Sequence, residues 1–136
     1  MSVVLSPEQE QIRESVLRVC QKFDDDYWLA RDTDGKFPED FCQAIVDEGF
    51  MGIAMPEKYG GSGLGITDAA VLAQAITESG AANAGFAALI IGIFGLNPVV
   101  VFGTDEQKQK WLPKMASSNG KSPQDSGIEN NAFFCP

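Results

Sequence analysis

Three adjacent carboxylates, Asp24, Asp25 and Asp26, form the densest group of potential metal ligands in the sequence. They could bind a cation, but the ligands of a calcium loop alternate along the chain instead of standing side by side. Three carboxylates at the end of a helix also oppose the helix dipole. We therefore predict a solvated connection after the first helix here, with cation binding as the alternative, and we assign no metal ligand.

The segment 56–65 (PEKYGGSGLG) is the most glycine-rich part of the chain, and glycine permits backbone conformations with positive φ. A phosphate-binding loop needs either the G-x-G-x-x-G spacing or a Gly-Lys-Ser/Thr sequence, and a β-branched strand before it. The segment has neither sequence and no such strand. It is predicted to be a connecting loop, with direct ligand contact as the alternative.

The three cysteines, Cys20, Cys42 and Cys135, form no Cys-x-x-Cys pair, and the sequence has no histidine. A zinc site is therefore not expected. Cys20 and Cys42 fall on the apolar stripes of predicted helices, where free thiols pack as small hydrophobic groups, as in a reducing compartment. The start of the chain lacks the basic and long apolar runs of a signal peptide. These features favour a cytoplasmic protein.

The composition indicates one soluble globular domain. Its 136 residues are 44% hydrophobic and 21% charged, with a net charge of −9. A chain of this length normally builds a single core. Nucleic acid is excluded as a partner because phosphate binding requires clustered lysine and arginine.

Two helix starts are marked by capping boxes, in which a hydroxyl and a glutamine three residues later bond to each other's backbone N–H groups. Ser6 and Gln9 form the first, and Thr104 and Gln107 form the second. The first box precedes apolar residues at helical spacing, namely Ile12, Val16, Val19, Cys20 and Phe23. The second precedes an amphipathic helix with Lys108 and Lys110 outward and Trp111, Leu112 and Met115 inward.

Between the two boxes, the sequence predicts a turn at residues 32–35 and a second helix that Phe37-Pro38 opens and Gly49 ends. Thr67 is predicted to cap a third helix, which Gly80 closes. The fold class is therefore all-α, a cluster of five to six helices.

Residues 85–103 carry no charge, and their apolar side chains cover every side of a helix. A helix of this kind is buried in protein or in lipid. Asn97 and Pro98 interrupt the run, and no lysine or arginine cluster flanks it, so a membrane span is disfavoured. Pro98 also removes a backbone donor. We predict two buried helices that meet near Leu96-Asn97.

The order of three segments resembles the N-terminal helical domain of acyl-CoA dehydrogenases: LSPEQEQIRESV, then GKFPEDFCQAIVDEGFMGIAMPEKYGGSGLGITDAAVLAQAI, then NPVVVFGTDEQKQKWLPKM. The resemblance covers residues 3–116, and its most specific parts are PEKYGG at 56–61 and FGTDEQK at 102–108. It implies an N-terminal domain at residues 1–116 and a polar tail at 117–136.

The resemblance implies a larger enzyme, usually tetrameric, with this helical domain, a middle β-domain and a C-terminal helical bundle. FAD is the implied cofactor, bound between the last two parts and a neighbouring subunit. A glutamate of the bundle removes the proton α to the thioester while a hydride passes from the β-carbon to the flavin. We expect neither the flavin domain nor that glutamate in this chain, and therefore no catalytic residue.

The tail departs from the family pattern. The family continues after the Trp-Leu-Pro helix with a short turn and a strand that leads to a Thr-Glu-Pro motif at the flavin. Here a polar, unpatterned segment follows. Residues 133–136 are either the first residues of that strand or the end of an unrelated sequence.

In the family, the helix that matches residues 85–96 lines the tunnel for the acyl chain. The resemblance places four residues on that wall, Phe86, Ala87, Ile90 and Phe94. The bulk of Phe86, Ile90 and Phe94 suggests a short or branched acyl group, because each buried methylene contributes about 0.8 kcal/mol and wall shape can therefore set the chain-length preference. The alternative is that all four are ordinary core residues.

The expected partners are an acyl-CoA substrate and either further copies of the chain or the remainder of a full-length enzyme. The expected function is the N-terminal portion of an FAD-dependent acyl-CoA dehydrogenase. The alternative is a non-catalytic helical module that holds an acyl chain or associates with a relative.

Overall fold

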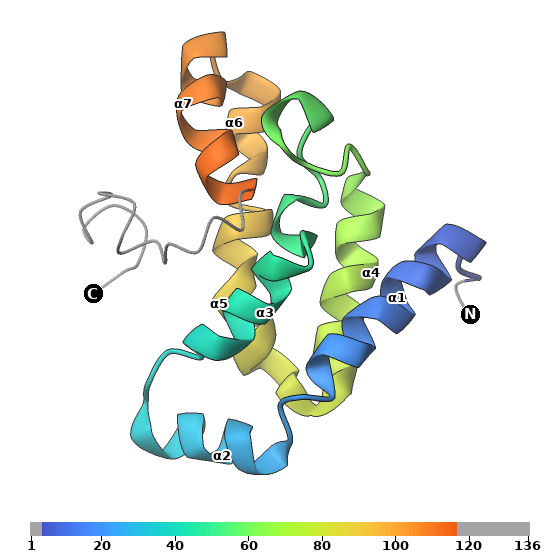
Figure 1. Ribbon diagram of the computed structural model, residues 1–136, viewed down its shortest axis with the longest axis vertical. Coiled ribbons are helices and arrows are strands. Elements are labelled where there is room, and N and C mark those ends of the chain that lie inside the picture. The colour runs from blue at the N-terminus through green and yellow to red at the C-terminus, as the bar shows by residue number, and fades with distance from the viewer. Residues whose placement is uncertain (1–3, 117–136) are drawn as a thin grey trace.

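The computed structural model describes residues 4–116, and every regular element in that range is helical, as the sequence predicts (Figure 1). The predictions made for residues 117–136, including Cys135 and the strand, lie outside the described residues. The helices are α1 (Pro7–Cys20), α2 (Asp25–Asp34), α3 (Glu39–Asp47), α4 (Ile66–Ile76), α5 (Ala82–Ile93), α6 (Asn97–Phe102) and α7 (Asp105–Ala116), with 3₁₀ turns at Phe50–Gly52 and Glu57–Tyr59 and a π-helical segment at Thr77–Ala81.

Both capping boxes are confirmed. The Ser6 hydroxyl accepts from the Gln9 N–H at 3.2 Å, and the Gln9 side chain accepts from the Ser6 N–H at 3.1 Å. At the start of α7, Thr104 and Gln107 make the same exchange at 3.2 and 2.9 Å. A cap of this kind is worth about 1 kcal/mol.

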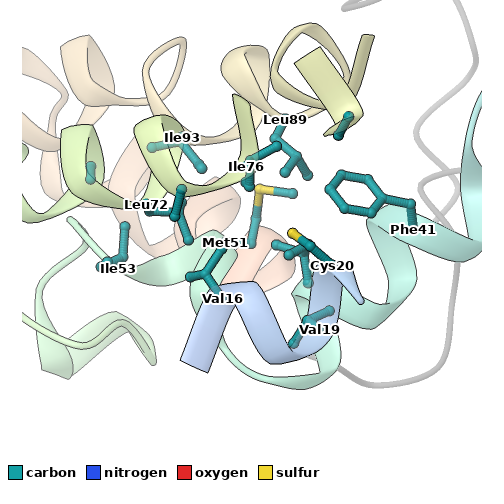
Figure 2. Close-up of a cluster of buried hydrophobic side chains, with 14 of the residues drawn as sticks. Val16, Val19, Cys20, Phe41, Met51, Ile53, Leu72, Ile76, Leu89 and Ile93 are labelled. Carbon is teal, nitrogen blue, oxygen red and sulfur yellow. The ribbon is translucent and has the colours of Figure 1, made fainter. Parts of the chain in front are cut away.

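The main core lies where α1 crosses α4, with α3 and α5 beside them (Figure 1). Figure 2 shows Met51 in the middle of this cluster, between side chains from α1 and α4. Its buried members are Val16, Val19, Cys20, Trp28, Phe41, Ile45, Met51, Ile53, Ala69, Leu72, Ala75, Ile76, Ala81, Leu89 and Ile93.

A second, smaller cluster joins α6 and α7 to the Glu57–Tyr59 turn. Its buried residues are Met55, Tyr59, Leu96 and Leu112. Met115 packs against it and Trp111 is half-buried, so the predicted inward face of α7 is confirmed in outline. The two clusters are connected, because α7 also contacts the Phe50–Gly52 turn, whose Met51 belongs to the main core.

The solvated connection predicted at the three aspartates is wrong, because these residues begin helix α2. The Asp24 carboxylate accepts from the Tyr27 N–H at 3.0 Å and caps the helix. Asp25 and Asp26 then lie in the first turn, where the helix dipole favours negative charge. Trp28 is buried, and its ring centroid lies 4.9 Å from that of Phe41. Residues 32–34 belong to this helix too. Of the turn predicted at residues 32–35, only Gly35 lies outside the helix, where it forms the C-cap with a φ of 66°.

The cap predicted at Thr67 is also wrong. Helix α4 starts one residue earlier, at Ile66, with Gly65 as its N-cap. The Asp68 carboxylate accepts from the Gly65 N–H at 2.9 Å and from the Gln9 side chain at 3.1 Å, which ties the start of α4 to α1. The end of the helix near Gly80 is confirmed, since that residue has a φ of 100°.

The apolar stretch splits between Ile93 and Asn97, next to the predicted boundary at Leu96-Asn97, but it is not buried on all sides. Helix α5 buries one side, and α6 contains no buried residue. Phe102 is 85% exposed and Val101 is 54% exposed. In the described residues only the inner side of α6 meets the second cluster, so the outer side has no cover. None of the helices between residues 4 and 116 combines the length and apolarity needed to cross a bilayer.

Candidate functional site

Helix α5 is held to the core by a side that includes two glycines. Gly85, Leu89, Gly92 and Ile93 recur at helical spacing and are all buried. A β-carbon on Gly85 would lie 2.6 Å from Ala81 Cβ, and one on Gly92 would overlap the Met51 sulfur. These glycines therefore let α5 approach its neighbours more closely than any larger residue would. The sequence prediction missed this role, because a glycine inside an apolar helix gives no sign of which neighbour it meets.

The four residues assigned to the acyl wall lie outside this buried side, Phe86, Ala87 and Ile90 on α5 and Phe94 as its C-cap. Phe86, Ile90 and Phe94 follow one another at intervals of four residues, so they form a line along the helix. All three are half-buried, and the rings of Phe86 and Phe94 lie 6.3 Å apart at an interplanar angle of 70°. Ala87 beside this line is exposed. We call these four residues the outer face of α5.

The outer face is apolar and electrically neutral. No charged residue occurs between Gly85 and Gly103, and Phe94 also packs against the main core. The Phe94 end of the outer face is therefore held by the main core, whereas Ala87 is exposed to solvent. Such a surface can bind hydrocarbon, but it offers no acid, base or nucleophile for a reaction.

The direction of α5 is set by an unusual backbone segment at its start. Ala82 has φ 45° and ψ −139°, a conformation that side-chain-bearing residues rarely adopt. Gly80 precedes it with a φ of 100°. Strain of this kind costs about 1–3 kcal/mol and persists only where the surrounding contacts impose it. This conformation could not be predicted from the residue type, because position 82 is an alanine.

The two described cysteines are free thiols, as predicted. Burial, with a smaller contribution from the Glu39 carboxylate, raises the pKa of the Cys42 thiol to about 12. Burial also raises the pKa of Cys20. Because the thiolate is the reactive form, neither side chain is suited to nucleophilic catalysis.

The glycine-rich segment is a connecting loop, as predicted. Four successive N–H groups donate to backbone carbonyls within the same region: Gly61 to Pro56 at 3.3 Å, Ser62 to Gly52 at 3.0 Å, Gly63 to Met55 at 2.8 Å and Leu64 to Ile53 at 3.1 Å. A phosphate cradle needs such donors free to point at the ligand. The donors of this loop are used to fold the chain, so the loop does not fit a flavin pyrophosphate.

Fold and face together define a helical domain that presents one neutral apolar helix surface and carries no catalytic group there. The chain matches the family "Acyl-CoA dehydrogenase, N-terminal domain" over residues 6–119. It therefore belongs to the acyl-CoA dehydrogenase family.

Several curated relatives match most of the chain. A probable acyl-CoA dehydrogenase of Bacillus subtilis is 35% identical over 119 residues, which is 86% of this chain and 30% of that protein. The mitochondrial isobutyryl-CoA dehydrogenase of Dictyostelium discoideum is 30% identical, covering 85% of this chain and 27% of that protein. The mitochondrial isovaleryl-CoA dehydrogenase of Pongo abelii is 32% identical, covering 83% and 27%.

The fold is also found in a solved structure. A chain from work on the electron transferring flavoprotein of Acidaminococcus fermentans superposes with a TM-score of 0.73 and 27% sequence identity. The match covers 85% of this chain and 30% of that one. The chain thus spans only about 30% of the length of its relatives.

Proposed function

We propose that this chain acts as the N-terminal portion of an FAD-dependent acyl-CoA dehydrogenase, where the outer face of α5 forms one wall of the acyl pocket. The observation that carries the proposal is the uncharged line of Phe86, Ile90 and Phe94 on a helix whose opposite side is fixed to the core. An acyl chain laid along this line would exchange water contact for hydrocarbon contact.

The wall favours a short or branched acyl group. The half-buried rings of Phe86 and Phe94 and the side chain of Ile90 fill the line from end to end. A longer chain would have to displace a ring, whereas a branched one adds width rather than length. Two relatives are described as isobutyryl-CoA and isovaleryl-CoA dehydrogenases, which supports the same substrate class here.

The reaction chemistry would come from outside the described residues. The family is FAD-dependent, and the flavin would supply the hydride acceptor in the assembled enzyme. We propose that residues 4–116 contribute hydrocarbon contact and packing, while other parts of the enzyme, from the same or a neighbouring subunit, hold the flavin and the base.

A chimera tests this proposal. Residues 6–116 of this chain would replace the matching segment of the Bacillus subtilis relative, and acyl-CoA dehydrogenation would be measured with acyl groups of increasing length. We expect turnover with short branched substrates, and a shift toward longer chains in the Phe86→Ala variant. The Leu29→Ala variant is the control, because Leu29 is 64% exposed on α2 and is not part of the outer face of α5. A folded, flavin-loaded chimera without turnover would contradict the proposal.

The exposed Ala87 favours a second candidate function, a non-catalytic module that holds an acyl chain on the open face. Calorimetric titration of the 136-residue chain with isobutyryl-CoA separates the two functions. Binding that Ala87→Asp abolishes would support the module. Absence of binding heat, together with an active chimera, would contradict the module and support the role as the N-terminal portion of the enzyme.

A further inference from the structure

Met51 supports helix α5 from the side that faces the core. It lies in the Phe50–Gly52 turn, which contacts α5, and it is only 8% exposed. A β-carbon on Gly92 would overlap the Met51 sulfur, and it would lie 3.3 Å from Met51 Cε and 3.6 Å from Met51 Cγ. Three successive side-chain atoms of Met51 therefore occupy the space that a side chain at residue 92 would need.

Gly92 stands opposite two residues of the outer face of α5. Residues two positions apart in an α-helix are separated by about 200° around its axis, so Gly92 lies nearly opposite Ile90 and Phe94. Phe94 is the C-cap, and its backbone keeps the right-handed helical conformation. Gly92 is buried, whereas Ile90 and Phe94 are half-buried. A push on the helix at Gly92 would therefore move these two side chains away from the core.

The turn that carries Met51 has little freedom to retreat from α5. The Gly52 carbonyl accepts from the Met55 N–H at 3.0 Å and from the Ser62 N–H at 3.0 Å. The second of these bonds ties the turn to the glycine-rich loop. The backbone behind Met51 is therefore fixed, and the length and shape of the side chain at residue 51 determine how closely α5 approaches. Methionine suits this position because its unbranched side chain fills irregular gaps.

The two ends of α5 are held in different ways. Near its start, a β-carbon on Gly85 would lie 2.6 Å from Ala81 Cβ, an atom that has no torsion of its own. Near its end, the helix rests on the Met51 side chain, which lies in the middle of the main core (Figure 2). A change of size at residue 51 or 92 would therefore tilt the far half of α5 more than its start.

We propose that Met51 is a positioning residue that sets the depth of the acyl pocket from behind, by holding the far half of α5 at the distance that Gly92 permits. The inference rests on the proposed function, in which the outer face of α5 is a wall of that pocket. Met51 acts through α5 and does not belong to the outer face itself.

The chimera with the Bacillus subtilis relative tests the proposal with two substrates that differ by one methylene, isobutyryl-CoA and 2-methylbutyryl-CoA. Gly92→Ala should push the wall toward the acyl chain and raise KM for the longer substrate. Its kcat/KM relative to isobutyryl-CoA should then fall about fourfold, the equivalent of one buried methylene. The kcat for isobutyryl-CoA should change little, because no reacting group moves.

Met51→Ala is the compensating change, because it removes the side chain that presses on Gly92. The double variant Gly92→Ala/Met51→Ala should return the substrate ratio to within about twofold of the unsubstituted chimera, although both changes disturb the core. Met51→Ala alone should shift the ratio the opposite way, toward the longer substrate, and it serves as the test if Gly92→Ala does not fold. Asp24→Ala is the matched control, because it removes the cap of α2 and leaves α5 and residue 51 unchanged.

Three results would overturn this inference alone. The first is an unchanged substrate ratio in a folded, flavin-loaded Gly92→Ala chimera. The second is a shifted ratio that the double variant does not relieve, and the third is an equal shift in Asp24→Ala, since loss of stability would then explain the effect. An unsubstituted chimera without turnover would instead contradict the proposed function and this inference together, so the two failures are distinguishable.

Discussion

Replacing Gly85 with alanine tests whether close packing fixes the position of α5. In the structure, a β-carbon at this position would lie 2.6 Å from Ala81 Cβ, 3.2 Å from Ile76 Cγ2 and 3.3 Å from Trp28 Cη2. The Ala81 Cβ is bonded directly to the backbone and has no torsion that could move it away. The helix itself must therefore shift to accept the methyl group.

Two opposing effects set the magnitude. Overpacking of a core by one methyl group costs about 1–3 kcal/mol. Alanine in place of glycine inside a helix gains about 1 kcal/mol. Because the closest neighbour is immobile, we expect the upper part of the overpacking range and a net loss of about 1–2 kcal/mol. For a chain of this length that loss lowers the melting temperature by roughly 3–8 °C.

Urea or thermal unfolding followed by circular dichroism measures this effect. Ala87→Gly provides the matched control, because Ala87 is exposed on the same helix and reports the helix preference without packing. Ala87→Gly should cost about 1 kcal/mol. If Gly85→Ala instead stabilised the protein by a similar amount, helix preference alone would explain the result, and the close contacts would be refuted.

Three further predictions concern the caps, the strained residue and a thiol. Asp24→Ala should destabilise the protein by about 1 kcal/mol, measured by urea unfolding, because it removes the cap of α2, whereas an unchanged stability would mean that the cap contributes nothing. Ala82→Gly should raise the free energy of unfolding by about 1 kcal/mol, because relief of the positive φ outweighs the added entropy of the unfolded chain. A lower free energy of unfolding in this variant would argue against strain at residue 82. Burial, then the Glu39 carboxylate, raises the pKa of Cys42 from 9.0 to about 12, so the folded chain keeps a proton that the unfolded chain releases. The free energy of unfolding should therefore fall as pH rises above 9.0, and Cys42→Ala should flatten that fall in guanidinium titrations repeated across this range.

Local signals in the sequence predicted local structure well. Ser6 and Thr104 correctly predicted the starts of α1 and α7, because a capping box needs only four consecutive residues. The same local reasoning failed at Asp24, where three carboxylates could follow one helix or begin the next. In the structure the aspartates begin the next helix, and that helix is held by the buried Trp28, which packs against the Phe41 ring of α3. This contact joins two separate elements, so the residues around Asp24 alone could not predict it.

The sequence predicted that the candidate site is apolar, but it could not predict which of its side chains are buried and which are exposed. An uncharged stretch such as residues 85–103 has no polar side, so its periodicity cannot reveal which residues face the core. The two buried glycines of α5 and the exposed Phe102 depend on the neighbours that folding supplies. The placement of Phe86, Ala87, Ile90 and Phe94 on an acyl wall came from the family resemblance, and it stays a prediction.

Photolabelling tests the acyl wall most directly. The chimera would be irradiated with a short acyl-CoA that carries a diazirine at the end of its acyl chain, and the labelled peptides would be identified by mass spectrometry. We predict that label on this domain falls within residues 86–94 and that excess isobutyryl-CoA prevents it. Label on α1 or α2, or no competable label on this domain in an active chimera, would contradict the assignment of α5 as the wall of the acyl pocket.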